Sequence, residues 1–168
     1  MTEAATESPA VAPGETGWEV RPARTDDVPA VAAAVAALLA ELGGTPPARS
    51  AIESEARAHI EDPSLGIVLV ASAGDELVGV LTASWARAIQ VAGRLLTIEV
   101  LWTRQDWRDR GVGAALVEAL ASAAAAEGAG RVEVGLPRES FPALRATERF
   151  YLANGFERLG PRMRRAVP

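Results

Sequence analysis

The chain has 168 residues, a formal net charge of -5 at pH 7, 49% hydrophobic and 23% charged residues, which favours one domain with one core. No apolar run approaches the ~20 residues of a membrane helix, and the acidic balance argues against general nucleic-acid binding. The absence of Cys excludes disulfides and thiolate catalysis, and one His, His59, expected as a partly solvated helix residue, offers little for a metal site or a Ser-His-Asp triad.

The first third of the chain predicts a tail, a strand and two helices. Residues 1–17 are rich in Ala, Thr, Glu and Pro, without a basic start or an apolar stretch. We therefore expect a disordered tail and no secretory signal there, followed by one domain over 18–168. A short strand over 18–22 precedes a helix over 25–42, which Thr25 caps and Gly43-Gly44 ends. A second, more polar helix is predicted over 50–60.

The middle of the chain predicts three strands and a helix. A strand over 67–71 leads through a turn at Gly74-Asp75 into a partner strand over 77–85. The third strand, over 95–103, has the apolar content of a strand buried on both faces. After a loop, a helix over 111–127 carries a buried stripe of Val112, Leu116 and Leu120, spaced at i, i+4 and i+8.

The last part predicts a strand over 131–136, a helix from Ser140 to about 154, and a closing hairpin with strands over 156–159 and 162–167. The strand-helix-strand crossover should place two parallel strands side by side. The expected fold class is α/β (α+β), with a central mixed, mostly antiparallel sheet of about six or seven strands and about four helices.

Residues 97–113 carry the clearest chemical signal, because a strand runs through a short loop into a helix start with Gly111 and Gly113. The first turn of a helix leaves N–H groups unpaired, and its dipole favours anions. Glycines let a phosphate approach the backbone closely, and Arg108 and Arg110 add suitable positive charge. A site for a pyrophosphate or similar anion is therefore predicted here.

Two other phosphate-binding motifs are excluded. A Walker A loop ends in Gly-Lys-Ser/Thr, and the chain has no Lys. A dinucleotide fingerprint needs a third glycine where Leu116 stands, and its loop is shorter.

Four segments together resemble a known family. They are Arg108-Asp109-Arg110-Gly111-Val112-Gly113, the strand Ile98-Glu99-Val100-Leu101-Trp102-Thr103 before it, Arg21-Pro22-Ala23 followed by Asp27, and Phe150-Tyr151-Leu152-Ala153-Asn154-Gly155-Phe156. In this order and spacing they resemble the GNAT superfamily of acetyl-coenzyme-A-dependent N-acetyltransferases. The first matches its Arg/Gln-x-x-Gly-x-Gly/Ala signature, and the last its late Phe-Tyr-x-x-x-Gly-Phe segment.

The resemblance implies a place for acetyl-coenzyme A (acetyl-CoA) as cosubstrate, with no metal. Strands around Leu101 and Val134 would splay apart, with the acetyl thioester in the gap and the pantetheine arm paired to the first strand. The implied coenzyme-binding residues are Leu101, Trp102, Thr103, Arg108, Asp109, Arg110, Gly111, Val112, Gly113 and Ala114. The sequence departs from the family at Leu144, where many members have an Asn that contacts the coenzyme.

Direct acetyl transfer needs one group that takes a proton from the amine and one that gives a proton to the thiolate. Tyr151 by itself could be a buried aromatic with a satisfied hydroxyl; the resemblance implies the general acid. Strand alternation places Glu99 on one face with Leu95, Thr97, Leu101 and Thr103. Glu99 is either a structural acid satisfied by Arg or water, or the general base, and the resemblance favours the base.

The acceptor carries no motif of its own. Glu53, Glu55, Glu61 and Asp62 could recruit a cationic amine or form an ordinary solvated helix face, and Glu133 could be a solvated residue or the partner of an Arg. Expected acceptors are a small-molecule amine or an exposed peptide or protein amine, in a cytoplasmic protein without a membrane partner. Monomer and homodimer remain open.

Two alternative functions remain. One is a non-catalytic acyl-CoA-binding sensor. The other is an acetyltransferase for aminoacyl-tRNA, which needs a basic face. Only Arg158, Arg162, Arg164 and Arg165 offer such a face, and they also suit a charged edge strand.

Overall fold

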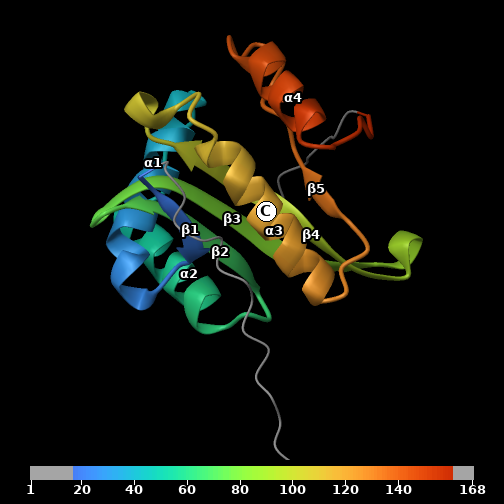
Figure 1. Cartoon of the computed structure of the whole chain (residues 1–168). Helices are drawn as coiled ribbons and strands as arrows, with labels where there is room; N and C mark the ends of the chain where they lie inside the picture. Colours follow the sequence, from blue (N-terminus) through green and yellow to red (C-terminus); the bar gives the residue numbers. More distant parts are fainter. Residues whose placement is uncertain (1–16, 161–168) are drawn as a thin grey trace, which may run out of the picture.

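The computed structural model describes residues 17–160 of the chain, and within them a single mixed sheet is flanked by four helices (Figure 1). The strands lie in chain order: β1 (Glu19–Pro22), β2 (Gly66–Ala73), β3 (Glu76–Ala88), β4 (Gly93–Thr103) and β5 (Val132–Val134). The helices are α1 (Val28–Glu41), α2 (Arg49–Glu61), α3 (Val112–Ala126) and α4 (Leu144–Ala153). Strands β1 to β4 pair antiparallel, and β5 pairs parallel to β4.

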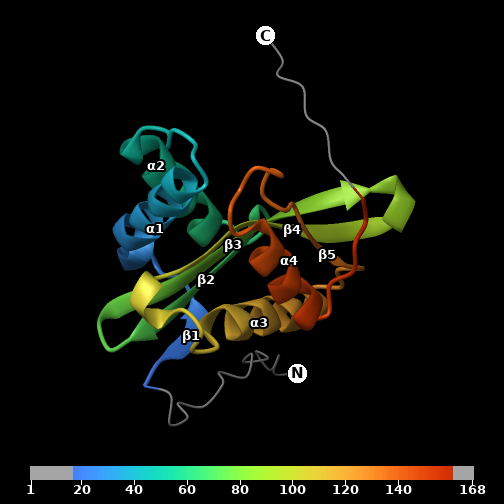
Figure 2. The ribbon, with the colours of Figure 1, turned by 90° about the horizontal axis from the view of Figure 1, so that it is seen from above.

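The sheet is covered on both faces, as the apolar content of its strands predicts. Helices α1 and α2 lie on one side and α3 on the other (Figure 2). On the α3 side, Leu81 and Leu96 are fully buried against Leu116 and Leu120, and each such side chain contributes about 1.5–3 kcal/mol of burial. The expected stripe on α3 is confirmed. No helix within residues 17–160 is long and apolar enough to cross a membrane.

The connection from β1 into α1 is fixed by an ion pair between two residues of the predicted opening segment. The Arg21 guanidinium donates to both carboxylate oxygens of Asp27, at 2.7 and 3.0 Å. Asp27 also accepts the backbone N–H of Arg24 at 2.7 Å. The hydrogen bond from Arg21 holds the pKa of Asp27 below its ordinary value. The predicted turn at Gly74-Asp75 is confirmed too, since Ala73 pairs directly with Glu76.

Three expectations for the last part of the chain are corrected. Within residues 17–160 the sheet has five strands, where six or seven were expected for the whole chain. Residues 156–159 form no strand, because Phe156 packs on the Tyr151 ring and Arg158 pairs with Glu148 of α4 at 2.6 Å. The expected strand over 162–167 lies outside the described residues, as do residues 1–16 of the expected tail. Helix α4 begins at Leu144, after turns through Phe141, and not at Ser140.

Gly79 on β3 sets how closely α3 approaches the sheet. A Cβ atom there would lie 2.7 Å from Val112 Cγ1 and 3.0 Å from Leu116 Cδ1, and both side chains are buried. We expect Gly79→Ala to lower the free energy of unfolding by about 1–3 kcal/mol, the usual cost of overpacking a core. Denaturant titration measures it. Gly93→Ala in β4 is the control, because its Cβ would come no closer than 3.7 Å to its nearest neighbour; equal stability of both variants would contradict close packing at Gly79.

Candidate functional site

The parallel pair of strands separates part-way along β4. Pairing with β5 is limited to Leu96 with Val132, Thr97 with Glu133 and Ile98 with Val134. Beyond Ile98, β4 continues to Thr103, while the chain after Val134 leaves the sheet toward α4 (Figure 1). The edge of β4 from Glu99 to Thr103 therefore has no strand partner on that side within the described residues. We call this opening the splay.

Glu99 lies at a β-bulge beside the splay. Thr82 of β3 pairs with Val100, but the next residue, Ala83, pairs with Ile98, so Glu99 is the extra residue on β4. A bulge reverses the alternation of side chains along a strand.

The expectation that Glu99 shares a face with Leu95, Thr97, Leu101 and Thr103 is therefore wrong. Leu101 packs in the α3-side cluster with Leu96 and Ile98, whereas regular alternation would have placed it on the face opposite to them. Thr103 also turns to α3, since its Oγ1 lies 3.7 Å from a Cβ built at Gly113. The one extra residue at the bulge therefore reverses the face of the sheet to which the side chains after it in β4 point.

The Glu99 side chain is exposed. Its carboxylate forms no hydrogen bond or ion pair with residues 17–160. The Arg partner expected for a structural acid is therefore absent within residues 17–160, and the Glu99 side chain is open to solvent. It is accessible to a ligand that enters the splay.

Tyr151 is buried on the α3 side of the sheet, with 7% of its surface exposed. Its ring makes edge-on contacts with Phe150 and Phe156, at centroid distances of 5.2 and 5.1 Å. Burial raises the pKa of its hydroxyl to about 12, because a phenolate is poorly solvated there. The hydroxyl makes no hydrogen bond within the described residues and is not sealed from solvent. The hydroxyl is therefore neutral at pH 7.

The loop between β4 and α3, residues 104–111, ends in a helix start without a side-chain cap. Asp109 and Gly111 have φ values of 60° and 81°, and Gly111 is the N-cap residue of α3. Because no side chain caps the first turn, its N–H groups are available to an anion. We call residues 104–111 and the first turn of α3 the donor loop.

Because Gly113 has no side chain, α4 and the end of β4 pack closely against the start of α3. A Cβ atom at Gly113 would lie 3.3 Å from Phe150 Cζ and 3.7 Å from Thr103 Oγ1. The segment that contains Tyr151 and the end of β4 therefore meet at the start of α3. Leu144, where many family members have an Asn, is the first residue of α4 and is half-buried.

All three arginines of the donor loop are engaged within the protein, and Arg104 pairs with Glu76 and Asp106 at 2.8 and 2.7 Å. Arg108 donates from Nη2 to Glu41 at the end of α1 at 2.8 Å, and from Nε to the Thr103 carbonyl at 3.2 Å. The Arg110 guanidinium lies 4.9 Å from the centroid of the Trp107 ring. The sequence contains no signal for Glu41 as a partner of the loop, because it lies 67 residues earlier.

The acidic residues considered for the acceptor region, and Glu133 of β5, are mostly in local pairs. Glu53 pairs with Arg49 at 2.8 Å, Glu61 with Arg57 at 3.7 Å, and Glu133 with Arg131 at 3.6 Å. Asp62 accepts the backbone N–H of Ser64 at 2.9 Å. Among these five residues, only the Glu55 carboxylate forms no hydrogen bond or ion pair within residues 17–160. His59 is half-buried and held by the Glu55 carbonyl and the Ser84 hydroxyl, so it joins α2 to β3.

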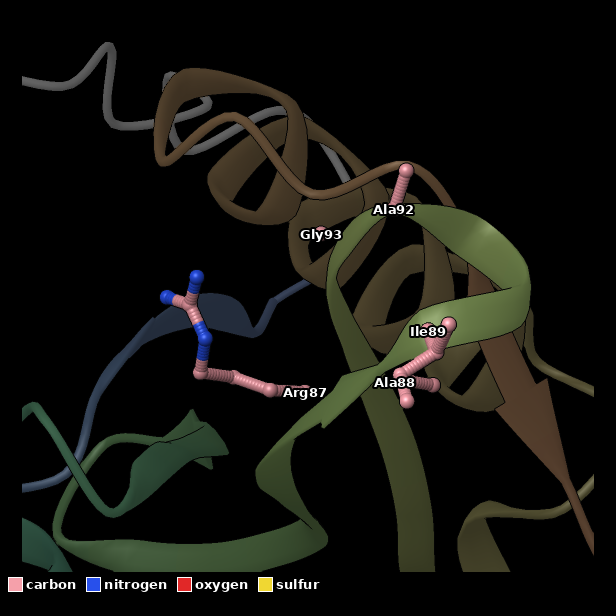
Figure 3. A pocket seen from close by; sticks show the side chains of 5 residues that line it. All are labelled: Arg87, Ala88, Ile89, Ala92 and Gly93. Atoms are coloured by element: carbon pink, nitrogen blue, oxygen red, sulfur yellow. The ribbon is translucent and has the colours of Figure 1, made fainter.

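A shallow pocket lies at the tip of the hairpin between β3 and β4 (Figure 3). It is lined by Arg87, Ala88, Ile89, Ala92 and Gly93. This tip precedes β4, whereas the donor loop follows it, so the length of the strand separates the two, about 3.3 Å per residue. The pocket is not part of the site at the splay.

The comparison with protein families decides the identity of the fold. Residues 35–156 match the acetyltransferase (GNAT) family. The chain therefore belongs to the GNAT acetyltransferase family. The matched range includes β4, the donor loop and Tyr151. This family uses acetyl-CoA and transfers acyl groups.

Solved structures of GNAT proteins share the fold at low sequence identity. A possible acetyltransferase from Clostridium difficile 630 has a TM-score of 0.76 and 18% identity, over 90% of this chain and 97% of its own. An aminoglycoside acetyltransferase from an uncultured soil metagenomic sample has a TM-score of 0.72 and 16% identity, over 92% and 99%. The ribosomal-protein-alanine N-acetyltransferase of Brucella melitensis biovar Abortus 2308 has a TM-score of 0.69 and 16% identity, over 90% and 99%. No curated protein matches the sequence.

Gly111→Val is expected to abolish coenzyme A binding. At φ 81° a β-branched residue strains the backbone, and no atom lies within 4 Å of a Cβ there, so the side chain would project into open space beside the helix start. Isothermal calorimetry measures the affinity. Gly128→Val is a matched control, because Gly128 has φ 72° and equally open surroundings at the other end of α3. Unchanged affinity in Gly111→Val, or equal loss in both variants, would contradict a phosphate site at Gly111.

Proposed function

We propose that this GNAT protein transfers the acetyl group of acetyl-CoA directly to a primary amine. The observation that carries the proposal is the splay. An unpaired edge of β4 runs to an uncapped helix start, with an exposed carboxylate beside it at Glu99 and a buried neutral phenol at Tyr151. These are the chemical groups that direct acetyl transfer requires.

The residues fit acetyl-CoA along its length. The N–H and C=O groups of the β4 edge, from Glu99 to Thr103, suit the amides of an extended pantetheine arm. The backbone N–H groups from Asp109 to Ala114 suit a pyrophosphate. The thioester would then lie in the splay, between Glu99 and Tyr151.

The proposed reaction has one nucleophilic step and two proton transfers. The neutral amine nitrogen attacks the thioester carbonyl carbon, the new C–N bond forms, and the C–S bond breaks. Glu99, directly or through a water, takes a proton from the amine nitrogen. The Tyr151 hydroxyl gives its proton to the departing sulfur, so that coenzyme A leaves as a thiol. No covalent bond to the protein is needed, which agrees with the absence of Cys.

We propose a small-molecule amine or an exposed peptide or protein amine as the acceptor, in the cytoplasm. The aminoglycoside and ribosomal-protein acetyltransferases that share the fold make both kinds worth testing. An acceptor on aminoacyl-tRNA has less support, because the net charge is -5 and Arg158 is already paired with Glu148.

An amine panel assayed for thiol release from acetyl-CoA tests the function. It should contain polyamines, aminoglycosides, amino acids and peptides with free N-termini. Turnover of any of them that depends on Glu99 and Tyr151 supports the proposal. Binding of coenzyme A without turnover on the whole panel would favour the sensor, and turnover confined to aminoacyl-tRNA would favour the other alternative.

A further inference from the structure

Two arginines from different segments meet the same turn of α1. Arg108 of the donor loop donates to Glu41 at 2.8 Å, and Arg138, between β5 and α4, donates from Nη2 to the Leu42 carbonyl at 2.9 Å. These contacts join residues 67 and 96 positions apart in the sequence. The end of α1 thus holds both segments that leave the splay, one from β4 and one from β5.

The C-terminal turn of α1 favours positive charge. Gly43, at φ 75°, ends the helix, and the N–H groups of Gly43 and Gly44 bond to the carbonyls of Ala40 and Leu39. This pair of bonds is the Schellman motif, which fixes the end of a helix. The negative end of the helix dipole favours cations there. The turn therefore offers a rigid anchor for both guanidinium groups.

Arg108 is held on two sides and directed toward α1. Its guanidinium spans from the Thr103 carbonyl, the last residue of β4, to the Glu41 carboxylate. Helix α1 covers the face of the sheet opposite to α3 (Figure 2), whereas the helix start proposed for the pyrophosphate belongs to α3. Two hydrogen bonds of the Arg108 guanidinium are therefore already made within the protein, to Thr103 and to Glu41.

We infer that Glu41 is a positioning residue of the donor site, which acts through Arg108. The residue after Arg108, Asp109, has φ 60°, a conformation that is costly for a residue other than glycine. The Glu41–Arg108 pair fixes the chain immediately before this strained position, and so holds the N–H groups of the donor loop in place for the pyrophosphate. The inference rests on the proposed function. It assigns to Arg108 the role of fixing the loop, and not that of a direct contact with the phosphate.

Calorimetric titration of coenzyme A into the full-length protein tests this inference. Glu41→Gln and Arg108→Ala should each weaken binding about three- to five-fold, the scale of one partly exposed ion pair. The double variant should be no weaker than Arg108→Ala alone, because both substitutions remove the same pair. Glu127→Gln is the control: it removes an ion pair outside the donor loop, to Arg94 at 3.9 Å, and should leave the affinity unchanged.

A second measurement separates positioning from general destabilisation. In Glu41→Gln, the KM for acetyl-CoA should rise with kcat retained, while the KM for acetylpantetheine, which has no pyrophosphate, should stay unchanged. An equal rise for both donors would overturn the inference.

Three affinity results would also overturn it. Unchanged affinity in Glu41→Gln would remove the role of Glu41, and tighter binding would mean that Glu41 competes with the pyrophosphate for Arg108. A loss in Arg108→Ala far beyond that in Glu41→Gln would mean that Arg108 contacts the phosphate itself. Failure of the wild-type protein to bind coenzyme A would overturn the proposed function as well, so the two failures are distinguishable.

Discussion

Tyr151→Phe is expected to lower kcat by about 10²–10⁴, the usual contribution of a general acid or base, at unchanged affinity for coenzyme A. The variant keeps the ring and its edge-on contacts with Phe150 and Phe156, and the lost hydroxyl makes no hydrogen bond within residues 17–160. Melting temperature should therefore stay nearly the same. Steady-state kinetics and thermal melting on the best amine of the panel measure both quantities.

The pKa of Tyr151 adds a pH-dependent expectation. Burial raises this pKa to about 12, so the hydroxyl stays protonated through neutral and mildly alkaline pH. A loss of wild-type activity in that range therefore arises from another group. Tyr151→Leu, which removes ring and hydroxyl together, should lose stability as well as turnover. Full activity in Tyr151→Phe would remove the hydroxyl from the mechanism, and a loss of stability alone would leave Tyr151 a structural residue.

Glu99→Gln should lower kcat/KM by about 10²–10⁴ at neutral pH, the scale of a general base. Activity should partly recover at high pH, where more of the acceptor amine is already deprotonated. Because Glu99 is exposed at a bulge and has no partner within the described residues, the substitution should change neither stability nor coenzyme A affinity. The pH dependence of kcat/KM is the decisive measurement.

A control for Glu99→Gln must remove a carboxylate elsewhere. Glu127→Gln, at the far end of α3, makes the same change of charge at an exposed ion pair and should leave the pH–rate profile as in the wild type. A profile of unchanged shape and height in Glu99→Gln would reject the base role. A uniform fall at all pH values would instead indicate that Glu99 orients the acceptor.

Features that depend only on residues close together in the chain could be predicted from the sequence. The stripe of Val112, Leu116 and Leu120 depends only on the helical repeat, and it packs on the sheet as predicted. The turn at Gly74 and the left-handed Gly111 depend on local backbone freedom. The parallel pairing of β4 with β5 follows from the strand-helix-strand order, and the splay beside Val134 was implied by the family resemblance. The roles of Glu99 and Tyr151 remain predictions.

The rest was decided by contacts that join distant parts of the chain. The bulge at Glu99 exists because β3 pairs with β4 in a register that omits one residue, and a period-two pattern in one strand does not reveal its partner's register. Phe156 was expected in a strand but is held by the ring of Tyr151. The partner of Arg108 lies 67 residues away. Sequence pattern thus determined most of the elements up to β5 and the loop that leads into α3. Register and long-range pairing, which arise only when the elements pack, determined the end of the chain and where the side chains of the site point.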